Sequence, residues 1–165
     1  MVRGLLDGWM VSGENAWVAG DWQSVTMSTV DGFDFTGGQE GARPVLVGDP
    51  ELSRGERDPL TGWLSASAFA RPSGRGDLGN TPRVVFRQPG VNNWNVAVFK
   101  NFALGGPRAF QLRVEAYNVL NTVQFREVFR DLRFDAAGKQ VNQNFGKASR
   151  SRNSRVMQVS LRFTF

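Results

Sequence analysis

The sequence predicts an all-β fold of antiparallel strands, of the kind that forms membrane β-barrels, with long extracellular loops. Three observations predict it. Apolar and polar residues alternate with a period of two over four segments of roughly ten residues, which indicates two-faced strands. One connection between these segments is tight and the other two are long. The last segment keeps its alternation up to an aromatic residue, Phe165.

Composition narrows the possible functions. The 165 residues suffice for one domain or for a piece of a larger one, and 41% hydrophobic residues suit a folded chain. Cysteine and histidine are absent, which excludes disulfides, thiol catalysis, imidazole bases and the usual zinc ligands. We therefore expect no catalytic residue, no cofactor and no metal site, and we expect that the chain is not an enzyme.

Charge and hydropathy exclude three further features. The net charge of +5 comes mostly from arginines that are scattered along the chain, so we predict no nucleic-acid partner. The start, "MVRGLLDGWM", lacks the long apolar run of a signal peptide. No stretch approaches 18 consecutive apolar residues, which excludes a transmembrane helix but not a transmembrane strand.

The first predicted strand covers residues 8–20. Trp9, Val11 and Trp17 fall on one side of it, opposite Ser12 and Glu14, although Met10 and Val18 weaken the pattern. The two tryptophans are eight positions apart. At about 3.3 Å per residue and a tilt near 40°, this is roughly 20 Å along a membrane normal, close to the distance between the aromatic girdles of a barrel.

A hairpin is predicted for residues 93–121. The strand at 93–104 sets Trp94, Val96 and Val98 against polar neighbours and becomes ambiguous at Phe99 and Lys100. The strand at 109–121 alternates apolar side chains with polar ones. The stretch "LGGPR" between them predicts a tight turn at 105–108.

The fourth predicted strand covers residues 154–165. Its apolar side carries Met157, Val159, Leu161, Phe163 and Phe165, and its polar side carries Gln158, Ser160, Arg162 and Thr164. We expect this strand to pair antiparallel with residues 109–121, because strands that follow one another in sequence usually lie side by side.

Two long connections remain, at about residues 31–92 and 122–153. Residues 37–92 offer no further alternating strand, and Thr26–Phe35 could either extend the first strand or begin the loop. Connections of this length are rare in compact soluble domains. Short turns at one end and long loops at the other are typical of an outer-membrane barrel, whose long loops lie outside the cell.

A soluble alternative stays open on pattern alone. The apolar strand faces could instead pack on one another in a sandwich or a lipocalin-type barrel, and the chain would then be a soluble β-sheet binding module for carbohydrates or surfaces. In that case Arg113 and Glu115 could form a binding pair. In a membrane barrel they are solvated residues of the lumen, which is the interpretation we favour.

Several segments resemble the C-terminal end of TonB-dependent outer-membrane receptors of the Oar-like group, whose plug follows a carboxypeptidase-regulatory-like domain. The most specific are "FKNF" at Phe99–Phe102, "RVEAYNVLN" at Arg113–Asn121 and the terminal aromatic residue. The resemblance covers nearly the whole chain. It implies a location in the outer membrane of a Gram-negative bacterium.

The resemblance also implies partners and residue roles. The apolar residues of the last strand would form the signal read by the barrel assembly machinery: Met157, Val159, Leu161, Phe163 and Phe165. The other partners would be outer-membrane lipid, the rest of the receptor barrel and its plug, with TonB reached only through a missing N-terminal part.

We expect residues 1–165 to be a C-terminal piece of a larger barrel. Four strands cannot close around a lumen, and an open sheet edge in hydrocarbon leaves backbone groups unpaired. In the complete barrel, polar side chains of the last two strands should face the lumen: Gln111, Arg113, Glu115, Gln158, Ser160 and Arg162.

Overall fold

The computed structural model describes residues 6–38, 41–58, 60 and 62–165, and these form two compact units. The sheet unit consists of Met1–Val18, Val91–Gln124 and Arg152–Phe165, within the described range. The loop unit consists of Ala19–Gly90 and Phe125–Ser151. No helix among the described residues is long and apolar enough to cross a membrane.

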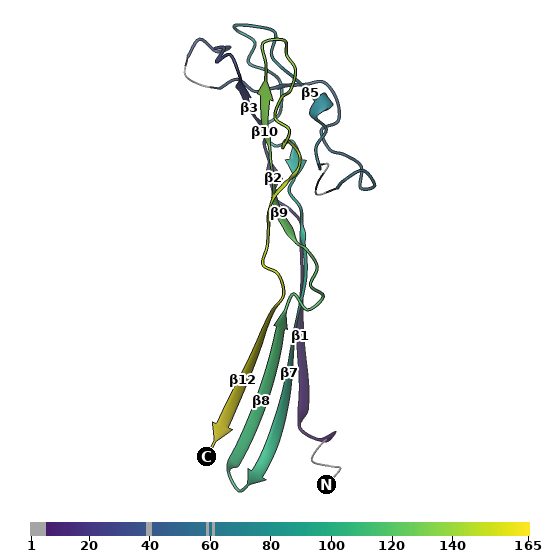
Figure 1. Cartoon of the computed structure of the whole chain (residues 1–165), viewed down its shortest axis with the longest axis vertical. Coiled ribbons are helices and arrows are strands. Elements are labelled where there is room, and N and C mark those ends of the chain that lie inside the picture. Colours follow the sequence, from purple (N-terminus) through teal and green to yellow (C-terminus); the bar gives the residue numbers. More distant parts are fainter. Residues whose placement is uncertain (1–5, 39–40, 59, 61) are drawn as a thin grey trace. The chain divides into compact units, whose positions relative to one another are not determined.

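Four antiparallel strands build the sheet unit, as the sequence predicts (Figure 1). Their order is β1-β7-β8-β12, and their bounds are Trp9–Val18, Val91–Gly105, Arg108–Tyr117 and Val156–Thr164. The expected pairing of the last strand with the third is confirmed, with Val159 opposite Val114. The sheet is open: within the described residues no strand pairs with the far edge of β1 or of β12.

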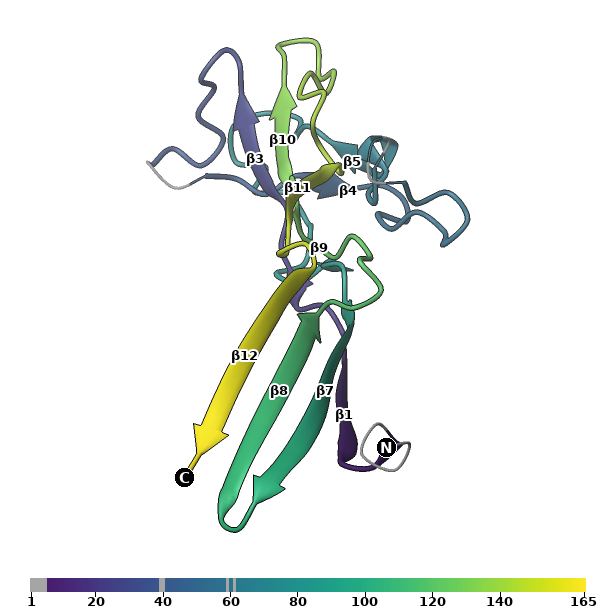
Figure 2. The same ribbon diagram turned by 60° about the horizontal axis from the view of Figure 1, so that its bottom comes forward.

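The predicted tight turn is confirmed. Gly105 pairs with Arg108, so only Gly106 and Pro107 connect β7 to β8. Gly105 and Gly106 have φ of 93° and 60°, a left-handed backbone that glycine adopts without a steric penalty. The four strands lie side by side in both views of the sheet (Figure 1, Figure 2).

The third strand ends earlier than predicted, at Tyr117 instead of residue 121. Asn118 and Asn121 have φ of 52° and 50°, so the backbone turns left-handed there. Asn118 stabilises the turn through its side chain: its amide donates to the Thr122 carbonyl at 2.9 Å, and its carbonyl accepts from the Thr122 backbone N–H at 3.2 Å. Asparagine tolerates this conformation better than most residues.

The prediction that residues 37–92 form no further alternating strand is correct in one respect, because the strands described there have only two residues each. The long connections nevertheless fold. The loop unit contains β2 (Trp22–Gln23), β3 (Thr26–Thr29), β4 (Val45–Leu46), η1 (Ala66–Ala68), β5 (Phe69–Ala70), β6 (Phe86–Arg87), β9 (Phe125–Val128), β10 (Asp131–Phe134) and β11 (Ala148–Ser151).

Short strand pairs hold the loop unit together, and among the described ones β3–β10 alone joins its two chain segments, Ala19–Gly90 and Phe125–Ser151. The pairs are β3 with β10 in parallel, and β2 with β6, β4 with β5 and β9 with β11 antiparallel. The segment that the sequence left unplaced, Thr26–Phe35, thus begins with β3. The unit has its own hydrophobic core, whose buried members are Val25, Leu64, Ala68, Phe69, Phe86, Val128, Leu132, Phe134 and Phe145.

Candidate functional site

The sheet unit has two chemically different faces. Its register places Val11, Val98, Val114 and Val159 in one row across all four strands. Further apolar side chains of β8 and β12 lie opposite each other on the same face, in the pairs Leu112–Leu161 and Phe110–Phe163. The face is uncovered: Val159 and Leu161 are 64% and 66% exposed, although water disfavours such surface.

The residues predicted to face the lumen lie together on the opposite face. Gln111, Arg113 and Glu115 of β8 are opposite Arg162, Ser160 and Gln158 of β12. Glu115 accepts hydrogen bonds from the Arg113 guanidinium and from the Tyr117 hydroxyl. The Arg113 guanidinium also lies 4.9 Å from the centroid of the Phe99 ring, a cation–π distance. The structure thus brings Arg113 and Glu115 into one ion pair within a polar strip.

Lys100 lies on the apolar face, where the sequence pattern became ambiguous. β7 continues without a bulge there, because Phe99 and Lys100 pair with Arg113 and Leu112 in turn. The lysine is only 3% exposed, and its Nζ donates to the Asp7 carbonyl. Lys100 follows Trp94, Val96 and Val98 by an even number of positions. The alternation of side chains along a strand could therefore have assigned it to their face from the sequence alone.

Aromatic rings enclose that lysine near the turn end of the sheet. Its Nζ lies 5.1 Å from the Trp9 ring centroid and 5.4 Å from that of Phe102. At the other end of β1, the Trp17 indole N–H donates to Asn92. Tryptophan presents an apolar body and one polar donor, which suits the boundary between hydrocarbon and water.

The five residues of the expected assembly signal share one face of the last strand. Met157, Val159, Leu161 and Phe163 are all more than half exposed, and Phe165 is 91% exposed. The rings of Phe163 and Phe165 stack with their centroids 6.0 Å apart. These five residues therefore form a continuous apolar stripe that the described residues leave uncovered.

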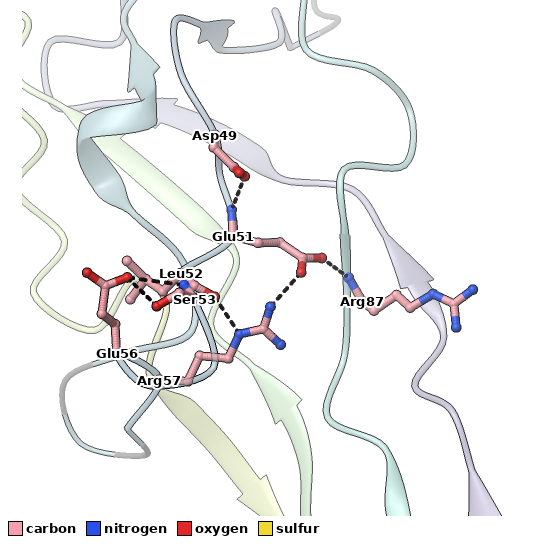
Figure 3. Close-up of polar contacts among 7 residues, drawn as sticks. All are labelled: Asp49, Glu51, Leu52, Ser53, Glu56, Arg57 and Arg87. Atoms are coloured by element: carbon pink, nitrogen blue, oxygen red, sulfur yellow. Dashed lines mark hydrogen bonds and ion pairs between the residues drawn. The ribbon is translucent and has the colours of Figure 1, made fainter.

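Charged side chains hold the loop unit together at points that the sequence did not indicate. Glu51 accepts from the Arg57 guanidinium at 2.6 Å and from the Arg87 backbone N–H at 3.0 Å, and so joins two segments of the first long connection (Figure 3). The Arg87 guanidinium lies 4.8 Å from the Trp22 ring centroid. Glu56 accepts from the Ser53 hydroxyl at 2.7 Å in the same region (Figure 3).

Arg71 connects three separate segments of the loop unit. Its guanidinium donates to the Asp31 carboxylate at 2.8 Å and to the Asp135 carbonyl. It also lies 5.5 Å and 5.3 Å from the ring centroids of Phe33 and Phe35. Every named contact is internal to the unit, so the arrangement suits structural support better than ligand binding.

Hydrogen bonds lower the pKa of two loop carboxylates. For Asp31 the main cause is the hydrogen bond from the Arg71 side chain, and partial burial opposes it. For Asp77 the main cause is the Ser73 backbone N–H, followed by the Gly79 backbone N–H, and these lower its pKa. Both carboxylates are therefore held in the ionised form that these donors stabilise.

An open antiparallel sheet with one exposed apolar face and one polar face defines a class of protein, the membrane β-barrels, whose strands meet lipid on one side. Comparison with known families agrees: a family model described as an outer membrane beta barrel domain matches residues 1–158. The chain belongs to this family, and its location is the outer membrane. No curated protein and no solved structure matches the chain.

Proposed function

We propose that the chain is the C-terminal part of the barrel of a TonB-dependent outer-membrane receptor of the Oar-like group. Such a receptor takes up a large nutrient with energy from the inner membrane, and this part of it acts in transport and not in catalysis. The "FKNF" and "RVEAYNVLN" segments support the assignment within the wider outer-membrane barrel family.

The observation that carries the proposal is the open order β1-β7-β8-β12, with no strand described beyond either edge. Both edges would leave backbone N–H and C=O groups unpaired inside a bilayer, at several kcal/mol each. Pairing with further strands of the same receptor removes this cost, and TonB-dependent barrels of about 22 strands offer such partners.

The polar face supports the same proposal. A plug within the lumen presents mostly polar surface, and the row of Arg113, Glu115 and Arg162 offers it charges of both signs. Partners of this receptor would be its own plug and upstream strands, outer-membrane lipid and the barrel assembly machinery. TonB would bind through the N-terminal part of the receptor.

Photo-cross-linking of the full-length receptor in cells tests the proposal. The photoreactive residue is placed in the N-terminal part that precedes the plug, and capture of TonB is compared with a receptor that keeps this residue but has the sequence around it scrambled. We expect a TonB adduct with the unscrambled receptor alone. An outer-membrane barrel that never yields this adduct would be a member of the family with another function.

A further inference from the structure

Although the arginines are scattered along the chain, its net positive charge comes from the segment that connects β8 to β12. Residues 124–155 hold eight Lys and Arg residues and three Asp and Glu residues, a difference of +5. This difference equals the net charge of the whole chain, so the remaining residues are balanced. The last basic residues of this segment, Arg152 and Arg155, come immediately before β12.

Arg155 continues the apolar side of the last strand. Met157, Val159, Leu161, Phe163 and Phe165 occupy alternate positions on one face, and Arg155 is the next position in that series. Arg155 and Phe165 are ten positions apart. At about 3.3 Å per residue and a tilt near 40°, they span about 25 Å along the membrane normal, the usual height of the apolar band.

Both arginines are free to interact with a partner outside the chain. Arg152 and Arg155 are exposed, and neither side chain has an ion pair or a hydrogen bond with another residue that the structure describes. Their backbones are fixed, because the Arg152 N–H donates to the Gln124 carbonyl at 2.7 Å and the Arg155 N–H donates to the Asn121 side chain at 3.3 Å. Anchored cations at this height lie where lipid headgroups begin.

We propose that Arg155, assisted by Arg152, binds the phosphate of an anionic lipid headgroup, one that carries no cation of its own, at the loop end of β12. In outer-membrane barrels the long loops lie outside the cell, so this lipid belongs to the outer leaflet. A planar guanidinium can donate two hydrogen bonds to one phosphate. The inference depends on the outer-membrane barrel assignment, but not on TonB or on the transported substrate.

Lipid retention in native mass spectrometry tests this proposal. The full-length receptor is purified in detergent, equilibrated with equal amounts of phosphatidylglycerol and phosphatidylcholine, and the ratio of the two bound lipids is measured. We expect wild type to retain more of the anionic lipid. Arg155→Gln should lower the ratio about fivefold at low salt, and Arg152→Gln should lower it less. Arg155→Lys keeps the charge but not the paired donors, so its ratio should lie between those of wild type and Arg155→Gln.

Arg162→Gln is the matched control, because Arg162 lies on the polar face of the same strand and carries the same charge. Its ratio should equal that of wild type, and added inorganic phosphate should leave all ratios unchanged. An unchanged ratio in Arg155→Gln, or an equal fall in Arg162→Gln, would overturn the proposal. Heat-modifiable migration of each variant shows separately that the barrel is folded, so failure of the barrel assignment is distinguishable.

Discussion

At the scale of single residues, the face of the sheet on which a side chain lies determines how much a substitution there destabilises the barrel. Leu161 and Ser160 are neighbours on β12 and point to opposite faces of the sheet, toward Leu112 and Arg113 respectively. Leu161 is 66% exposed on the apolar face. A charge placed there would have to enter hydrocarbon, whereas a charge at position 160 would meet the polar face.

We predict that Leu161→Arg destabilises the complete barrel protein by about 2–4 kcal/mol if the site lies near the bilayer midplane, and that Ser160→Arg is nearly neutral. Equilibrium unfolding in lipid vesicles measures both values. A larger loss for Ser160→Arg would show that the two faces are assigned the wrong way round.

Asn118 gives a physical reason for the "YNVLN" part of the motif. Its φ of 52° is left-handed, and its side chain closes the turn onto Thr122. Asn118→Ala should therefore cost about 1–2 kcal/mol through backbone strain alone, with the lost hydrogen bonds in addition. Asn118→Gly relieves the strain but not the lost bonds, so its unfolding free energy should fall between those of wild type and Asn118→Ala.

At the scale of elements, the sequence predicted the four long strands because their signal is local. Ten residues of period-two alternation suffice to identify β8 and β12, and the Gly-Gly-Pro stretch identifies the turn between β7 and β8. Errors at strand ends stay within a few residues. The largest, at Asn118, arises because asparagine stops the strand while Val119 and Leu120 still look apolar.

The loop unit could not be predicted in the same way. Its strands have two to four residues, too few for a periodic signal, and its core unites residues from both connections, such as Phe86 and Phe134. Arg71 reaches residues 40 and 64 positions away, Asp31 and Asp135. Such contacts follow from the three-dimensional fold and leave no pattern within one segment.

The stability of the loop unit should fall in acid. The pKa of Asp31 is lower in the folded chain than its ordinary value of 3.8, chiefly because of Arg71. A lowered folded pKa means that this carboxylate stabilises the fold above the ordinary value, and that the contribution is lost as the pH falls through the folded pKa. The pKa of Asp77 is lowered as well, so its contribution to stability is also lost as the pH falls.

We therefore expect hydrogen exchange around residues 29–35 and 69–73, corrected for the intrinsic rate, to rise as the pH falls below about 4. Asp31→Asn should raise exchange in these segments already at neutral pH and reduce its further increase in acid. Exchange that stays equal in wild type and variant at every pH would contradict the role given to the Asp31–Arg71 pair.

At the scale of the whole molecule, Phe165 tests how the barrel is assembled. Phe165 is 91% exposed and contacts the Phe163 ring, so its removal takes little packing from the chain. If it belongs to the assembly signal, its deletion should lower the abundance of the complete protein in outer-membrane fractions. Equal abundance with and without Phe165 would leave it as an ordinary aromatic residue of the membrane boundary.

The central claim is that one face of the sheet meets lipid and the other does not. Residues 1–165 contain no cysteine. Single cysteines at residues 157–163 can therefore be spin-labelled in the complete protein in vesicles, once any cysteine outside residues 1–165 is replaced, and tested for access to oxygen and to a water-soluble nickel complex. The account predicts high oxygen access at Met157, Val159, Leu161 and Phe163, alternating with low oxygen access at Gln158, Ser160 and Arg162. Oxygen access without this period of two, or with the opposite phase, would contradict it.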